Sequence, residues 1–271
     1  MKPASWDLPC SWSGSKGMAA AAQNVLVAVF GLSVGSFLNV VIVRLPEHRS
    51  LWRPGSACPS CGNAIAWYDN IPIVSFAVLS GRCRACGIPI PWRYPAVEIA
   101  TAGLWLMAYR VFGLSWSLAV AVVFLSALVT ITAIDLSHRI IPDLITLPGV
   151  LAGFLANLAT RQVSWLESLI GIGVGGGIFF VIILATAGRG MGGGDMKLAA
   201  MFGAFLGWKI TLVSLFVAVM LGGICATVFL VSGRMRRKDP IPFGPFLAVG
   251  GATGLLWGDR IVRWYLSGFA G

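Results

Sequence analysis

Charged residues are scarce in this chain, making up only 11% of its 271 residues, whereas 57% of the residues are hydrophobic. Soluble globular proteins have about 25% charged residues, so the composition excludes that class and predicts a membrane protein. Acidic residues are rarest: there are ten, against twenty Lys and Arg, for a net charge of +10. Lys/Arg-rich cytoplasmic loops explain this charge together with the hydropathy, so no nucleic-acid partner is expected.

No cleavable signal peptide is expected either. Residues 1–17 are mixed and polar, and the first apolar run, 18–43, is longer than the apolar region of a signal peptide. We therefore expect this run to stay in the lipid bilayer as a first spanning helix, preceded by a polar N-terminal extension.

Eight apolar stretches are candidates for membrane spans, each of which needs about 20 mostly apolar residues. They are residues 18–44, 95–112, 116–135, 142–160, 168–187, 196–208, 210–232 and 243–262. The sequence thus predicts an all-α polytopic membrane protein with about eight transmembrane helices. Thirteen basic residues fall in one set of loops and seven in the other, which places the first set in the cytoplasm and both termini on the opposite side.

Residues 45–94 interrupt this pattern, because they lack a long apolar run and hold four of the six cysteines. We expect them to form a small cytoplasmic domain inserted after the first helix. The predicted organisation is an extension (1–17), a first helix (18–44), the four-cysteine domain (45–94), a seven-helix membrane domain (95–262) and a C-terminal tail (263–271).

The four cysteines form two C-x-x-C pairs separated by 21 residues, and each pair is followed by a glycine. They are Cys58, Cys61, Cys83 and Cys86. Four thiolates in two tight turns suit tetrahedral Zn²⁺, although the spacing is slightly longer than the usual range. Disulfides are the alternative, which a reducing cytoplasm disfavours. With four protein ligands no position is left for water, so the predicted role is structural.

Two carboxylates are expected at one depth of the membrane. Asp135 ends the third span, and Asp195 follows a run of glycines at the start of the sixth, on the same predicted side. A carboxylate at membrane depth is costly and is read by default as functional. Two such groups in contact share a proton, so one can act as base on a water while the other donates a proton. This pattern predicts aspartyl peptide hydrolysis.

Purely structural roles remain open for each of these residues. Asp135 could cap the helix that starts near Pro142 or pair with Arg139, and Asp195 could be a helix N-cap. Asp143 is also well placed to cap a helix. Lys197 could pair with Asp195 or bind lipid phosphates.

Several segments, in order, resemble the bacterial prepilin peptidases, membrane aspartic proteases of type IV pilus and type II secretion systems. The resemblance covers about residues 30 to 250. The matching segments are Gly35–Pro46, the two cysteine pairs, Asp69–Pro72, Arg93–Glu98, Gly192–Asp195 (the G-x-G-D motif, here with an extra glycine) and Pro242–Leu247.

The resemblance implies a multi-pass enzyme of the bacterial inner membrane that cuts type IV prepilins and pseudopilins after a glycine, at the cytoplasmic face. Asp135 and Asp195 match its catalytic aspartates, with Gly192, Gly194 and Lys197 in the supporting loop. Many members also N-methylate the new terminus with S-adenosylmethionine, an activity associated with the four-cysteine domain. No G-x-G-x-x-G follows a strand, so the cofactor pocket stays unknown, with Glu98 and Asp69 as speculative candidates near it.

Three competing hypotheses remain. Broken glycine-rich helices with intramembrane acids are also typical of transporters and channels. Another G-x-G-D intramembrane protease without methyltransferase activity shares the aspartate motif, and an assembly scaffold would need no chemistry. The four-cysteine domain argues against the first two.

Overall fold

The computed structural model describes residues 13–188, 191–233 and 241–268. The regular elements of these residues are helices, with no strand in the described ranges and only two isolated β-bridges. Most of the extension predicted for 1–17 lies outside them, and the first helix begins at Ser13 rather than at residue 18. The elements are α1 (Ser13–Arg44), η1 (Trp67–Asn70), α2 (Val74–Val78), α3 (Arg93–Phe112), α4 (Trp116–His138), α5 (Asp143–Thr160), α6 (Trp165–Ala185), α7 (Gly193–Val231) and α8 (Gly244–Ser267).

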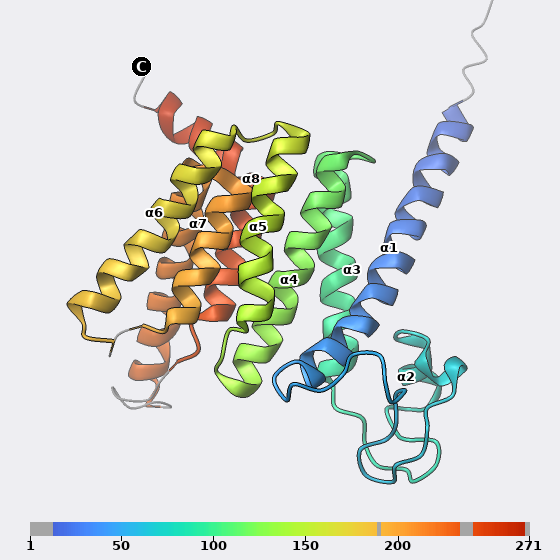
Figure 1. Cartoon of the computed structure of the whole chain (residues 1–271). Coiled ribbons are helices and arrows are strands. Elements are labelled where there is room, and N and C mark those ends of the chain that lie inside the picture. Colours follow the sequence, from blue (N-terminus) through green and yellow to red (C-terminus); the bar gives the residue numbers. More distant parts are fainter. Residues whose placement is uncertain (1–12, 189–190, 234–240, 269–271) are drawn as a thin grey trace, which may run out of the picture.

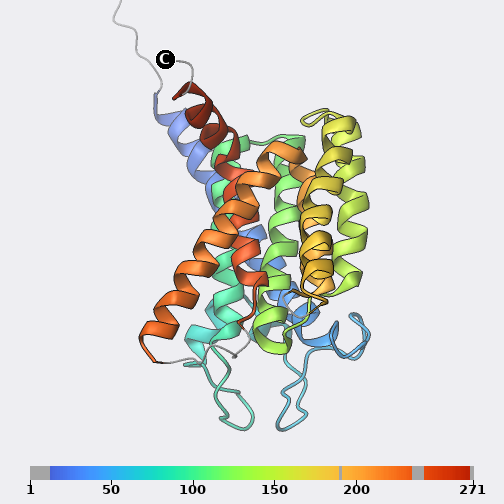
Figure 2. The same ribbon diagram turned by 90° about the vertical axis from the view of Figure 1, so that its left-hand side faces the viewer.

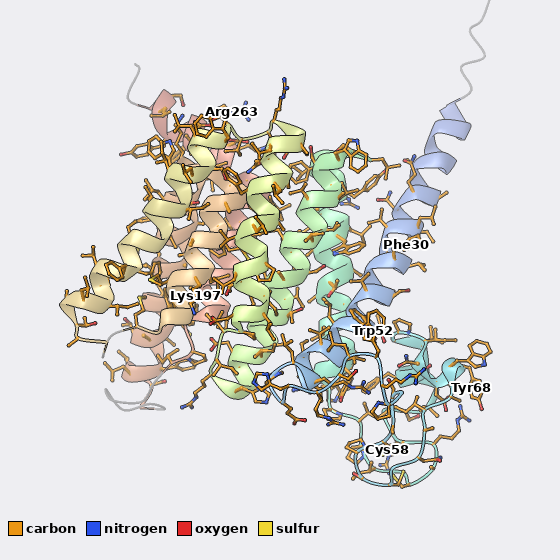
Figure 3. All side chains as sticks on the ribbon, in the orientation of Figure 1. Phe30, Trp52, Cys58, Tyr68, Lys197 and Arg263 are labelled. Carbon is orange, nitrogen blue, oxygen red and sulfur yellow. The ribbon has the colours of Figure 1, made fainter. Side chains whose placement is uncertain are left out.

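The long helices lie side by side in a bundle (Figure 1). Residues 45–92, which we call the cysteine segment, project from one end of this bundle, where Figure 3 labels Cys58. We call this end the cysteine end. The α4–α5 connection and the start of α7 lie at the cysteine end, whereas α1 starts and α8 finishes at the opposite end (Figures 1 and 2).

Two apolar cores hold the bundle together. The larger one joins α4, α7 and α8, and its buried Phe124 packs against Phe202 and Phe205, with ring centroids 5.7 and 4.8 Å apart. The smaller one joins α1, α3 and α4 and includes the buried Ile42 and Ile134. Because α4 contributes to both, it links the α1–α3 pair to the remaining helices.

Glycines bring α6 and α7 into backbone contact. A Cβ atom at Gly203 would lie 2.0 Å from the backbone of Gly171, and one at Gly175 would lie 2.2 Å from the Ala199 carbonyl oxygen. Small residues at a helix interface allow such close approach, and this packing drives association where lipid supplies no hydrophobic force.

Helix α7 folds back on itself at Gly207, which has φ 72° and ψ 171°. A Cβ at Gly175 would touch both Ala199 and Thr211, which in a continuous helix would be about 18 Å apart. Figure 2 shows the second half of α7 running away from the turn toward the cysteine end. The reversal lies where the sequence predicts a boundary between segments 196–208 and 210–232.

The turn in α7 frees backbone carbonyls, and neighbouring helices satisfy them. The Asn157 side-chain amide of α5 donates to the carbonyls of Ala204 and Phe205 at 2.8 and 3.1 Å, and the Ser168 hydroxyl of α6 donates to Ala204 at 2.8 Å. All three side-chain bonds are buried. Such partners are required because an unsatisfied polar group in a bilayer costs several kcal/mol.

The count of eight spans is not confirmed. Within the described residues, five helices are long and apolar enough to cross a membrane: α1 from Ala20, α4, α5, α6 and α7. Helix α3 falls short because it carries Glu98 and Arg110, and α8 because of its many glycines and the Asp259–Arg260 pair. The first half of α7, residues 193–206, is about 20 Å long, which is shorter than the hydrocarbon core of a bilayer.

Candidate active site and cysteine cluster

Asp135 is buried in the last turn of α4. Its Oδ2 atom accepts a hydrogen bond of 2.9 Å from the backbone N–H of Gly244, at the start of α8. A Cβ atom at Gly244 would lie 2.6 Å from this same oxygen, so the approach requires glycine. The backbone N–H of Arg139 donates to the Asp135 carbonyl, and this ends α4. Asp135 therefore does not cap α5; its carboxylate is held by α8.

Asp195 is the third residue of α7 and is half-buried. The N-cap is Gly192, and Asp195 Oδ2 accepts a hydrogen bond of 3.2 Å from its backbone N–H. Asp195 thus closes the first turn from inside the helix instead of serving as the N-cap. At Gly194 a Cβ atom would lie 2.8 Å from Ile141, so this glycine lets the loop approach the α4–α5 connection.

The two carboxylates come together at the cysteine end of the bundle. Asp135 arrives from the end of α4 and Asp195 from the start of α7, and they are close enough to interact electrostatically. The charge of Arg139 also acts on Asp135. The arrangement therefore brings two carboxylates together at the same end of the bundle.

Lys197 does not pair with Asp195. Its Nζ atom lies 2.6 Å from Oδ2 of Asp143, and this ion pair joins the starts of α7 and α5. Asp143 is the first residue of α5, whose N-cap residue is Pro142. The helical period explains the difference, because residues two apart on a helix point in nearly opposite directions.

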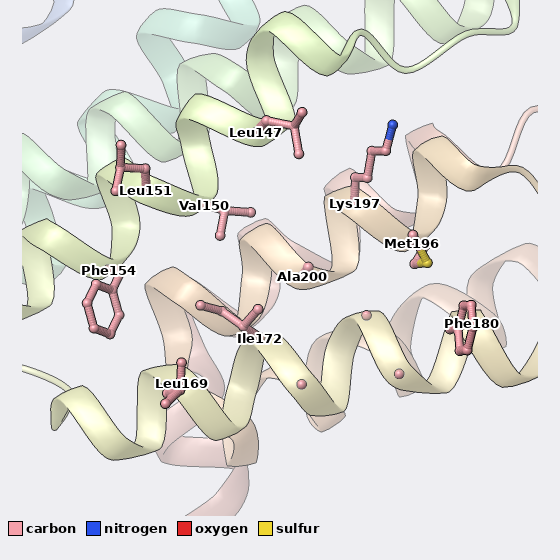
Figure 4. Close-up of a pocket in the computed structure, with 13 residues that line it drawn as sticks. Leu147, Val150, Leu151, Phe154, Leu169, Ile172, Phe180, Met196, Lys197 and Ala200 are labelled. Atoms are coloured by element: carbon pink, nitrogen blue, oxygen red, sulfur yellow. The ribbon is translucent and has the colours of Figure 1, made fainter.

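A groove of about 660 Å³ lies between α5, α6 and the first half of α7 (Figure 4). Its walls are apolar, with Leu151, Phe154 and Phe180 among them, and Lys197 stands at its edge. The α7 residues that line it are Met196, Lys197 and Ala200, whereas Asp195 does not. The groove is therefore on another face of α7 from the carboxylate pair.

The four cysteines of the two C-x-x-C pairs gather at one point. Their sulfur atoms all lie within 4.8 Å of one another, and the Sγ atoms of Cys58 and Cys86 are 3.8 Å apart. These four thiols are free, with no disulfide among them. The spacing suits four ligands around a single metal ion.

Both pairs adopt the same turn. The Cys58 N–H donates to the Asn63 carbonyl, and the Cys83 N–H donates to the Ile88 carbonyl, each at 2.9 Å. The following glycines, Gly62 and Gly87, have φ of 69° and 72° and donate to the carbonyls of Cys58 and Cys83. Positive φ explains why each pair ends in glycine.

The backbone around the first pair favours a thiolate. The N–H groups of Cys61 and Ser60 point at the Cys58 sulfur and lower the pKa of this thiol to about 6. A thiolate is the form that binds metal, so the turn prepares a ligand. Of the other cysteines, Cys225 is partly buried in α7, and Cys10 lies outside the described residues.

Polar contacts fix the cysteine segment to itself and to the bundle. Asp69 accepts two hydrogen bonds of 2.7 and 2.8 Å from Arg84, which hold the pKa of Asp69 below its usual range. Glu98 is buried on α3 and accepts a 2.8 Å hydrogen bond from the Ile73 N–H. Both candidates for the cofactor pocket therefore already have partners within the protein.

Arg44 is an anchor that sequence reasoning missed. It is nearly buried at the end of α1 and donates to the carbonyls of Ser50, Pro54 and Gly55 at 2.7 to 3.2 Å. One signal was available in the sequence, because Arg44 lies within the Gly35–Pro46 segment that resembles the family. Without that resemblance, a basic residue at the end of a span is interpreted as an ordinary charged residue of a loop.

Comparison with known proteins finds matches over most of the chain. Residues 29–112 match the Bacterial Peptidase A24 N-terminal domain, and residues 122–227 match the Type IV leader peptidase family. The prepilin leader peptidase/N-methyltransferase of Aeromonas hydrophila is 38% identical, over 90% of this chain and 94% of its own length. Those of Pseudomonas aeruginosa and Bacillus subtilis are 37% and 36% identical, over 90% and 89% of this chain and 93% and 97% of theirs. No solved structure is significantly similar.

Proposed function

Because the chain belongs to the type IV leader peptidase family, we propose that it cleaves the leader from prepilins and pseudopilins and N-methylates the new terminus. Cleavage follows a glycine, at the cytoplasmic face of the bacterial inner membrane. Family membership leaves no support for the transporter and scaffold hypotheses, and the relatives' names favour the bifunctional enzyme over a protease without methyltransferase activity.

The observation that carries the peptidase proposal is the pair of carboxylates at the cysteine end. Asp135 and Asp195 are the catalytic residues of this proposal. One carboxylate takes a proton from a water molecule, which attacks the scissile carbonyl, while the other, protonated, donates to the reacting peptide. The Gly244 N–H fixes the Oδ2 atom of Asp135 and so leaves its second oxygen for the water or the substrate.

The glycine run before Asp195 supports an approach of the substrate backbone. A Cβ atom at Gly193 would have nothing within 4 Å, so this side of the loop is open. The apolar helix of a prepilin enters sideways from the bilayer, and its basic leader stays in the cytoplasm, where the scissile peptide meets the aspartates.

The test uses purified enzyme, a prepilin and mass spectrometry of the products. Asp135→Asn and Asp195→Asn should each lower the cleavage rate by at least about 100-fold, because each removes a proton-transfer group. Asp143→Asn is the matched control, since its carboxylate is at the same end but pairs with Lys197. Cleavage at the wild-type rate by either catalytic variant would rule out the aspartyl mechanism.

Cys58, Cys61, Cys83 and Cys86 are proposed to bind one Zn²⁺ in a structural site. Four sulfurs within 4.8 Å and two matching turns support four-thiolate binding. Metal analysis of the purified chain should give one zinc per chain, and Cys58→Ser should lose it. Iron, or no metal at all, would contradict the assignment.

Methylation would take its methyl group from S-adenosylmethionine, and the residues that hold this cofactor are unassigned. Neither the groove beside Lys197 nor a second pocket near Gln162 and Trp208 adjoins the cysteine segment. Serine at both Cys58 and Cys61 should lower methylation more than cleavage if the segment serves that activity. An equal fall in both would leave the segment a role in folding only.

A further inference from the structure

The cysteine segment exposes large apolar side chains although it is expected in the cytoplasm. Trp52 is 82% exposed, Val78 71%, Val74 54% and Ile71 41%. Val74 and Val78 are four residues apart in α2 and so share one face of it. Residues 70–81, which contain α2, include no charged residue. We call Trp52, Ile71, Val74 and Val78 the interfacial face.

Trp52 lies alongside the membrane-spanning part of α1. Its ring centroid is 6.5 Å from that of Phe37, which is itself 44% exposed on the outside of this helix. The candidate span runs from Ala20 to Arg44. At 1.5 Å per residue, Phe37 is about 10 Å inside the end of that span. Trp52 therefore lies beside a level of α1 that is about 10 Å inside the end of the candidate span.

The start of α2 reaches a similar depth through a separate contact. The Ile73 N–H is bonded to Glu98 on α3, and the Cα atom of Glu98 would be 2.7 Å from a Cβ at Gly35 of α1. The Ser36 side chain of α1 also lies near the Glu98 carboxylate. Residues 35 and 36 are about 12 Å inside the end of the span. Two contacts, from residues 52 and 73, thus place two parts of the cysteine segment beside the same level of α1.

We propose that the interfacial face is embedded in the bilayer interface at the cysteine end, in contact with phospholipid. The lipid that surrounds Phe37 continues over Trp52 and α2, because they lie at the same level of α1. Trp is enriched at membrane interfaces, and a helix with one apolar face lies in the interface plane. Arg53, next to Trp52, can extend its charge to lipid phosphates.

This embedding fixes the height of the cysteine cluster relative to the membrane. The segment is then not a domain tethered in the cytoplasm: α2 and Trp52 rest in lipid, and the two cysteine turns project from it (Figure 3). The proposal is independent of the proposed catalysis, because the depth of a side chain can be measured whether or not the enzyme cleaves prepilins.

The test is photolabelling of the full chain in phospholipid nanodiscs. A phosphatidylglycerol that carries a diazirine on the acyl carbons nearest the headgroup is activated by light, and mass spectrometry locates the labelled residues. Phe30, which is 60% exposed within the span, is the positive control for labelling by lipid. Asn63, which is exposed in the first cysteine turn, is the negative control and gives the background. The proposal predicts labelling of Trp52 and residues 71–78 at least tenfold above Asn63 and comparable with Phe30.

The proposal would be overturned if the interfacial face is labelled no more strongly than Asn63. Such a result would mean that water, a second copy of the chain or a substrate helix covers this face instead of lipid. A variant pair adds a second measurement. Val74→Asp with Val78→Asp should reduce labelling of residues 71–78 at least fivefold, while the same two charges at Asn63 and Ala64 should leave it unchanged. Metal content checks the fold of both variants, and unchanged labelling in a folded Val74/Val78 variant would also contradict the proposal.

Discussion

The bundle around the carboxylate pair and the cysteine segment are held together in different ways. The bundle that carries Asp135 and Asp195 has a core of buried side chains such as Phe202 and Leu247, and its helices α6 and α7 are in backbone contact at glycines. Among the described residues of the cysteine segment, Cys58 is the one buried hydrophobic residue. The segment depends instead on its four thiols and on polar anchors from Arg44 and Glu98.

Because the two regions are held together differently, each should be able to unfold or lose its function without the other. A segment of about fifty residues with so little buried apolar surface needs a metal or another staple. The bundle needs close helix packing and gains nothing directly from the metal. Changes in one region should therefore leave the distinguishing property of the other in place.

The largest effect is expected where α6 and α7 touch. Gly203→Ala puts a methyl group 2.0 Å from the backbone of Gly171, where neither helix can yield by a side-chain rotation. The bundle should lose about 3 kcal/mol or more of unfolding free energy, the upper part of the range for overpacking. Denaturant unfolding in detergent measures this. Gly173→Ala on α6, with nothing within 4 Å, is the control and should unfold like the wild type.

Removal of a metal ligand should break the cysteine segment alone. Cys58→Ser should weaken metal binding by more than about 100-fold. Loss of a residue that only hydrogen-bonds to a ligand can cost roughly that much, and Cys58 is itself a proposed ligand. Metal titration measures the affinity, and denaturant unfolding of the bundle should stay unchanged. Cys225→Ser in α7 is the matched control and should keep the metal. Unfolding of the bundle in step with metal loss would contradict the separation of the two regions.

A smaller effect is expected where α8 meets Asp135. Gly244→Ala places a Cβ atom 2.6 Å from Oδ2 of Asp135 and must displace that carboxylate. Cleavage should fall by about 10- to 100-fold, as for other small misplacements of catalytic groups. Gly223→Ala on α7, with open space around it, serves as the comparison in the same prepilin assay. Full activity of the Gly244 variant would show that this hydrogen bond does not position the carboxylate.

The smallest effect is expected at the ion pair between α7 and α5. Lys197 and Asp143 are partly exposed, with 31% and 54% of their side-chain surfaces accessible. Pairs of this kind contribute about 0 to 1 kcal/mol, so Lys197→Met should lower cleavage by no more than about fivefold. A loss near that of Asp195→Asn would instead give Lys197 a part in the chemistry.

The sequence allowed the cysteine cluster to be predicted because its geometry is local. Each C-x-x-C-G turn closes through hydrogen bonds between residues within six positions, and the positive φ of Gly62 and Gly87 follows from residue type. Hydropathy likewise located the apolar helices and the break near Gly207. Residues 196–208 are already fewer than the roughly 20 that a span needs, but hydropathy could not show that the chain folds back at Gly207, because that depends on how the two halves of α7 pack.

The supports of the site could not be predicted because they join distant parts of the chain. Gly244, whose N–H donates to Asp135, is 109 residues away from it in the sequence, and Lys197 is 54 residues away from its partner Asp143. Similarly, nothing in the apolar residues 70–81 indicated that the Glu98 contact would bring them beside α1. These outcomes depend on helix packing, which spacing along a single sequence does not determine.

The central claim is that the carboxylate pair cleaves prepilins while the cysteine cluster holds metal independently. The direct measurement is a parallel assay of leader cleavage and metal content on Asp195→Asn and Cys58→Ser. We predict that the first variant keeps its metal and loses cleavage, and that the second loses metal and still cleaves. Cleavage by Asp195→Asn at the wild-type rate, with its metal intact, would contradict it.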